Sequence, residues 1–129
     1  MSGTQVEERT ADSIEWRQGQ WVKFSRRMPR PRFLSFMKLT VNLEELQGVD
    51  INADNIGEYT DKFDATLRAL YPILCAQIVA WNWLDYSEPE AEDPPVLPKP
   101  TTEILDTLDV YTEILWLIEA LSDVVFPKN

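Results

Sequence analysis

The most regular hydrophobic pattern lies in the middle of the chain, over residues 58–84. Apolar side chains recur there at steps of three and four residues, the spacing that places them on one face of an α-helix. This pattern predicts a long central helix with one buried face. Pro72 lies inside it and lacks the amide hydrogen that a helix interior needs, so we expect a kink there. The apolar positions are Tyr59, Phe63, Leu67, Leu70, Leu74, Ile78 and Trp81.

Two further helices are predicted on either side of this segment. Residues 32–47 carry apolar side chains at helical spacing, and Gly48 follows as a natural end. A C-terminal helix is expected after Thr101 or Thr102, because either hydroxyl can cap a free amide of the first turn. Trp116 lies outside the apolar seam of this helix, which gives the helix a second apolar face. We therefore expect other parts of the protein to cover the helix on two sides. The seam alternates four and three residues apart, as in a heptad, and comprises Ile104, Leu108, Tyr111, Leu115, Ile118 and Val125.

The N-terminal part is more polar, and its patterns are shorter. Residues 1–13 predict a flexible N-terminus. Residues 14–17 and 21–25 are short β-favouring runs separated by Gln-Gly-Gln, which predicts a small hairpin. Two prolines within residues 28–31 predict a rigid connector to the first helix. Together the patterns predict a mainly α fold, with one small helical domain over residues 14–129 and a short N-terminal β-hairpin.

The residue types most used in catalysis and metal binding are scarce in this chain of 129 residues. Histidine is absent, Cys75 is the single cysteine, and there are four glycines. These absences disfavour zinc sites, histidine-dependent catalysis and glycine-rich phosphate-binding loops. Residues 50–54 alternate Asx residues as a calcium loop does, but Asn55 stands where that loop needs glycine. We therefore expect turn and helix-cap roles for these Asx side chains, and no enzyme activity, metal or cofactor.

The sequence also favours a cytoplasmic location. A single cysteine permits no internal disulfide, which is typical of a reducing compartment. The first ten residues carry acids where a signal peptide needs a basic start and an apolar core. No apolar run is long enough to span a membrane. We therefore expect a protein that neither enters a membrane nor is secreted.

Charge is distributed unevenly along the chain, whose formal net charge is −10. Residues 1–40 contain eight basic and four acidic residues, whereas residues 41–129 contain four basic and eighteen acidic ones. The basic run between residues 23 and 38 could bind phosphates, but the overall negative charge would repel DNA. The favoured interpretation is that these side chains are solvated or neutralised by the protein's own acids, and we expect no nucleic-acid partner. A third interpretation is head-to-tail self-association, in which the basic end of one copy contacts the acidic end of the next. The basic set is Lys23, Arg26, Arg27, Arg30, Arg32 and Lys38.

Two tryptophans flank one asparagine at the end of the predicted central helix. Trp81 continues the buried stripe, whereas Trp83 lies two residues on and would point to a different face of a helix. Trp83 is therefore the better candidate for a partner contact, since tryptophan is enriched at binding hot spots. The alternative is that these tryptophans form the edge of the core. An acidic, proline-rich bridge over residues 85–100 follows, which predicts either a solvated connector or a docking segment. The residues expected to bind a partner are Trp83, Asn82, Asp85, Trp21, Arg26, Arg27, Arg30 and Trp116.

The order of these features resembles the tail assembly chaperones of long-tailed, siphovirus-type bacteriophages. The likeness rests on a helix that ends in Trp-Asn-Trp-Leu-Asp, an acidic bridge, a Leu-Pro-x-Pro and a closing helix. It extends to the N-terminal Gly-Gln-Trp-Val and Arg-Arg-Met-Pro segments, over residues 19–22 and 26–29. The acidic bridge is a departure, because related chains often have a short Asp-Gly-like turn there.

The resemblance implies a protein that coats the tape measure protein during tail assembly and recruits tail tube subunits before it leaves the finished particle. It implies action in the host cytoplasm and no enzyme activity. In this family a longer product is commonly made by ribosomal slippage, and residues 127–129 can be encoded by a slippery sequence. The residue-based alternative is a small acidic inhibitor that mimics DNA, favoured by the net charge of −14 over residues 41–129. An enzyme with two facing carboxylates ranks third.

Overall fold

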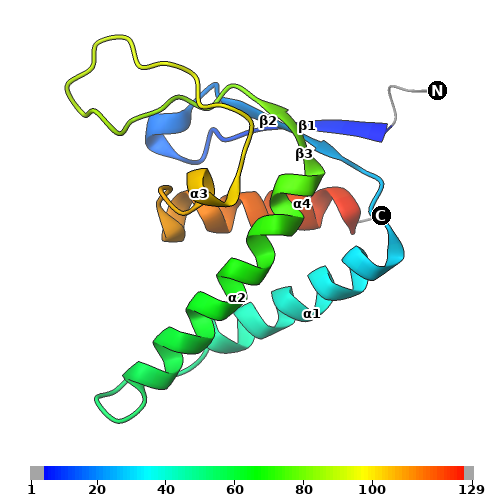
Figure 1. The fold of residues 1–129 in the computed structure, drawn as a ribbon, viewed down its shortest axis with the longest axis vertical. Coiled ribbons are helices and arrows are strands. Elements are labelled where there is room, and N and C mark those ends of the chain that lie inside the picture. The colour runs from blue at the N-terminus through cyan, green and yellow to red at the C-terminus, as the bar shows by residue number, and fades with distance from the viewer. Residues whose placement is uncertain (1–4, 127–129) are drawn as a thin grey trace.

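The computed structural model describes residues 5–126, which form a small antiparallel sheet and several helices (Figure 1). The described structure is about 52% helical. The predicted helical majority and N-terminal β-structure are both present, although the fold is mixed α and β rather than plainly mainly α. Within the described residues no helix is long and apolar enough to cross a membrane. In chain order the elements are β1 (Val6–Thr10), η2 (Glu15–Arg17), β2 (Trp21–Ser25), α1 (Arg30–Gln47), α2 (Ile56–Gln77), β3 (Ile78–Trp81), α3 (Thr102–Leu105), η3 (Val110–Ile114) and α4 (Leu115–Val125).

The sheet has the strand order β1-β2-β3, and both neighbouring pairs are antiparallel. β1 pairs with β2 in an N-terminal hairpin. Its first strand lies within residues 1–13, which we expected to be flexible, and the predicted strand over residues 14–17 is wrong. Residues 1–4, like the slippage sequence over residues 127–129, lie outside the described part of the chain.

The connection between β1 and β2 contains a 3-10 turn, η2, where we predicted a strand. Backbone hydrogen bonds at steps of three residues wind this segment, from the amide of Ile14 to the carbonyl of Ala11 and from the amide of Arg17 to that of Ile14. Arg17 is buried because its guanidinium pairs with Glu113. That partner lies 96 positions away in the sequence, so local β propensity did not reveal it.

Gly19 closes the same connection with φ = +81°, in the left-handed region. We expect Gly19→Ala to lower the free energy of unfolding by about 1 kcal/mol, because a Cβ disfavours positive φ. Urea denaturation measures this loss. Gly57→Ala in α2 is the matched control, since neither glycine has an atom within 4 Å of an added Cβ. The control should not destabilise, because alanine favours a helix; equal losses from both would contradict a backbone origin.

α2 continues through Pro72 but ends at Gln77, and the next four residues form β3. The predicted helix is therefore wrong beyond residue 77. The side-chain amide of Gln77 donates hydrogen bonds to the backbone carbonyls of Ser25 and Arg27. These bonds hold the end of α2 beside the end of β2, and the chain then runs antiparallel along β2.

α1 and the turn before α2 follow the sequence closely. α1 starts two residues before the predicted helix and ends at Gln47, with Gly48 as its cap. In the turn, Oδ1 of Asn52 accepts a hydrogen bond from the amide of Asp54, and Oδ1 of Asn55 accepts one from the amide of Asn52. The predicted turn role of the Asx side chains is confirmed, whereas the predicted helix-cap role is wrong, because Asn55 at the start of α2 makes no side-chain cap hydrogen bond.

The C-terminal helix begins where predicted but is interrupted. Oγ1 of Thr101 accepts a hydrogen bond of 3.2 Å from the amide of Ile104, which confirms the predicted cap. Asp109 starts a new helical segment, because its carboxylate accepts from the amide of Thr112 while its own amide donates to Glu113. The predicted continuous seam is thereby divided among α3, η3 and α4.

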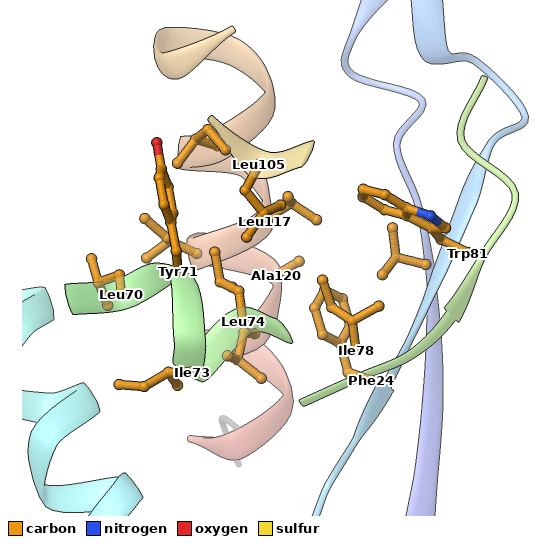
Figure 2. Packing of buried hydrophobic residues seen from close by; sticks show 14 of the residues in the cluster. Phe24, Leu70, Tyr71, Ile73, Leu74, Ile78, Trp81, Leu105, Leu117 and Ala120 are labelled. Carbon is orange, nitrogen blue, oxygen red and sulfur yellow. The ribbon is translucent and has the colours of Figure 1, made fainter. Parts of the chain in front are cut away.

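The hydrophobic core lies where α2, α4 and one face of the sheet meet (Figure 2). Leu70 and Leu74 enter it from α2, Leu117 from α4, and Phe24 and Ile78 from the sheet, and all five are fully buried. This core holds the C-terminal half of α2. The N-terminal half of α2 and its partner α1 extend away from the sheet as a helical hairpin (Figure 1).

Candidate partner-binding surface

Arg17 is a buried arginine held between two aromatic rings. Its guanidinium carbon lies 4.4 Å from the centre of the Trp83 ring and 4.9 Å from that of the Tyr86 ring. The guanidinium also donates hydrogen bonds to the side-chain oxygen of Gln20 (2.8 Å) and to the backbone carbonyl of Leu84 (2.9 Å). Only 2% of Arg17 is exposed. The desolvated cation is therefore held by ring stacking and by hydrogen bonds that suit a planar guanidinium.

Glu113 supplies the countercharge from η3. Its Oε2 accepts hydrogen bonds from Nε of Arg17 and from Nε1 of Trp16, the latter at 3.0 Å. Its Oε1 accepts a hydrogen bond of 2.8 Å from the amide of Asp109. A buried carboxylate needs such partners, because removing its charge from water is costly. The ion pair therefore joins the β1–β2 connection to the C-terminal helical segment. Together these two segments form the base of the neighbouring surface.

Two hollows share Trp16 as a lining residue, and the ion pair of Arg17 and Glu113 lines the first of them. The first has a volume of about 570 Å³ and lies between residues 84–89 and residues 107–109. The second has a volume of about 440 Å³ and lies between residues 13–16 and residues 111–119. Aromatic side chains line both hollows, and the side chain of Tyr111 is the most open of them at 75% exposure. We define the aromatic cleft by Trp16, Tyr86, Tyr111 and Trp116.

The lining of the aromatic cleft is acidic. Carboxylates of Asp85 and Asp109 line the first hollow, and those of Glu15 and Glu119 line the second. A hydrogen bond from the Ser87 amide lowers the pKa of Asp85, so this carboxylate keeps its charge to a lower pH than an ordinary aspartate does. Among the described lining residues Arg17 is the one basic side chain, and the buried ion pair neutralises it. The cleft therefore suits an apolar group that is flanked by positive charge.

Trp83 lies beneath this surface, and the prediction that it points outward is wrong. The residue is 0% exposed. Its ring stacks on Trp81 at a centroid distance of 5.1 Å and packs against Trp116 at 5.7 Å. The prediction assumed a helix at this point, whereas Trp81 ends β3 and Trp83 follows in extended chain. Residues two apart share a face of an extended chain, so both rings face the core.

Of the other predicted site residues, Asp85 and Trp116 lie in the lining of the aromatic cleft. Asn82 and Trp21 instead contact each other at the sheet, where Oδ1 of Asn82 accepts a hydrogen bond of 2.7 Å from the amide of Trp21. The amide of Asn82 in turn donates a hydrogen bond of 3.2 Å to the carbonyl of Trp21, which continues the pairing of β2 with β3 by one residue. Asn82 and Trp21 therefore have a structural role in this fold.

The three predicted arginines, Arg26, Arg27 and Arg30, are exposed and are not part of the cleft lining. Nε of Arg26 lies 3.4 Å from a carboxylate oxygen of Glu7, which supports neutralisation by the protein's own acids at that position. Arg32, from the same basic run, donates a hydrogen bond of 2.8 Å to the side chain of Gln77. The structure does not gather the basic run into one site.

The cleft depends on residues that the sequence interpretation missed. Tyr111 was placed on the apolar seam of the C-terminal helix, which could pack inside the molecule or on another copy, and its exposure shows that it does not pack inside the molecule. A local signal was present, because Asp109 precedes Thr112 and Glu113 as a capping residue precedes the first turn of a helix. No comparable local signal indicated that Arg17 would be buried. The missed residues are Trp16, Arg17, Tyr86, Tyr111 and Glu113.

Comparison of the chain with protein-family models, with curated proteins and with solved structures gives no match. Among residues 5–126, no group of three or more His, Cys, Asp or Glu side chains could hold a metal ion. Cys75 is half-buried, and burial raises the pKa of its thiol, which makes it a weak nucleophile at neutral pH.

Proposed function

We propose that this protein is a tail assembly chaperone of a long-tailed bacteriophage, which acts in the host cytoplasm without enzyme activity. In this role it binds the tape measure protein and recruits tail tube subunits. The observation that carries the proposal is the aromatic cleft, where Trp16 and Tyr111 are 44% and 75% exposed beside a buried ion pair. The ordered resemblance of the sequence to that family supplies the identity of the client.

The base of the cleft supports client binding because hydrogen bonds hold its side chains in place. Trp16 is held by its hydrogen bond to Glu113, so its ring is already oriented before a client arrives. A ring that is oriented in advance loses little conformational entropy on binding, which leaves more of the contact energy for affinity. Exposed aromatic side chains on such a base are typical of hot spots.

The acidic lining indicates what kind of client segment would fit. Glu15, Asp85 and Glu119 surround the aromatic rings with negative charge. A segment with apolar side chains for the two hollows and lysine or arginine beside them would match both features. A chaperone would cover such segments of the tape measure protein until the tail tube forms.

The proposal predicts that Tyr111→Ala weakens binding of the tape measure protein about 10- to 30-fold, because it removes an exposed aromatic contact. We expect the melting temperature to stay unchanged, since this side chain is mostly in solvent. Binding is measured by co-expression and by titration of the purified chain with the tape measure protein encoded in the same genome.

Ile51→Ala is the matched control, because Ile51 is an apolar residue with 50% exposure that lies in the turn between α1 and α2. This variant should bind the tape measure protein normally. Loss of binding in both variants, or in neither, would contradict the cleft as the binding surface. Failure of the unaltered chain to bind the tape measure and tail tube proteins would contradict the assembly role itself.

A further inference from the structure

α1 carries apolar side chains on two of its faces. The inner face includes the buried residues Phe36 and Leu43, which pack in the core. The outer face carries Leu34, Met37 and Val41, which are 52%, 41% and 51% exposed. These three lie at steps of three and four residues, so they form one continuous line along the helix, which we call the outer stripe. Figure 1 places α1 at the margin of the described fold, with α2 and α4 on its inner side.

Charged residues lie on the same face of α1 as the outer stripe. Arg30 lies four residues before Leu34, and Glu45 lies four residues after Val41, so both share the outer face. Lys38 lies beside the middle of the stripe. All three charged residues are exposed, and among the ion pairs of residues 5–126 none involves them. The outer face is therefore positive at its start and middle and negative at its end.

This order makes the outer face complementary to itself. If a second copy of α1 is laid antiparallel to the first, with the point between Met37 and Lys38 aligned in both, Leu34 lies opposite Val41 and Arg30 lies opposite Glu45. We propose that two copies of this chain associate through α1, antiparallel and related by a twofold axis at that point. Leu34 then packs on Val41 of the partner subunit, and Arg30 faces Glu45 of the partner subunit. The same contacts occur twice, as a twofold interface requires.

The charges favour a second copy in this orientation over the alternatives. A parallel pair would set Arg30 against Arg30 and Glu45 against Glu45, which repel. The antiparallel dimer is closed, unlike the head-to-tail chain that the uneven charge of the sequence indicated. One helix face is small for an interface, so we expect a dimer that dissociates on dilution. The inference does not rest on the proposed function, because the outer stripe is separate from the lining of the aromatic cleft.

Charge exchange tests the pairing. Sedimentation of the unaltered chain should give a concentration-dependent dimer. Arg30→Glu and Glu45→Arg should each raise the dissociation constant about tenfold or more, because each places like charges together at both ends of the interface. The double variant Arg30→Glu/Glu45→Arg restores opposite charges and should return the constant to within about threefold of the unaltered value. Lys99→Glu, an exposed charge change in the bridge, is the control and should leave dimerisation unchanged.

Disulfide trapping tests the direction of the helices. In a Cys75→Ala background, which removes the single natural thiol, a mixture of Leu34→Cys and Val41→Cys chains should form mixed disulfides. Chains of either variant alone should crosslink much less. Circular dichroism would verify that the variants fold. A monomer at every concentration, no rescue by the charge exchange, or efficient crosslinking of Leu34→Cys chains with each other would overturn the proposal.

Discussion

Replacing Arg17 with methionine is expected to destabilise the protein by about 3 to 5 kcal/mol. The change leaves the Glu113 carboxylate buried without its countercharge, and an unpaired buried charge is among the most costly defects in a folded protein. It also removes the cation from between the rings of Trp83 and Tyr86. Urea denaturation followed by circular dichroism at neutral pH measures the loss.

The double variant Arg17→Met/Glu113→Gln separates the charge from the packing. It removes both charges, so it should be more stable than Arg17→Met alone. Arg68→Met is the matched control, because Arg68 also pairs with a carboxylate, that of Asp64, but on the exposed surface of α2. We expect little change there. An Arg17→Met variant as stable as the Arg68→Met variant would show that the buried pair contributes nothing.

Trp83→Ala is expected to cost about 3 to 5 kcal/mol of stability, because it opens a cavity in the core. The ring is fully buried between Trp81, Trp116 and the guanidinium of Arg17, so its removal takes contacts from three neighbours at once. Thermal and urea denaturation measure the effect. Unchanged stability with weaker client binding would instead place the ring on the surface, as the sequence interpretation had it.

Trp83→Phe refines this test, because the indole nitrogen of Trp83 has no hydrogen-bond partner among the described residues. Phenylalanine keeps much of the apolar contact and removes the unpaired donor. It should therefore cost clearly less than alanine. A phenylalanine variant as unstable as the alanine variant would mean that the full width of the indole ring is needed to fill the site.

The parts of this fold that the sequence predicted correctly are those set by interactions between residues close together in the chain. α1, its end at Gly48 and the Asn52 turn were predicted because spacing, glycine ends and Asx hydrogen bonds act within a few residues. The Thr101 cap was predicted for the same reason. In the candidate site, Asp85 and Trp116 were the predicted residues that reached the aromatic cleft.

The tertiary structure determined which of these local patterns formed the element that they favour. Apolar steps of three and four favour a helix through Trp81, yet pairing with β2 turned the last four residues of that pattern into a strand. That pairing turned Trp83 inward, and the hydrogen bond from the Trp21 amide to Asn82 spans 61 positions. The burial of Arg17 required Glu113, 96 positions away, to provide its charge. The sequence by itself therefore determined where α1 and most of α2 form, since those signals are local. Contacts between distant segments determined which aromatic rings were buried and which were left exposed to form the cleft, because burial depends on what the folded chain places opposite each side chain.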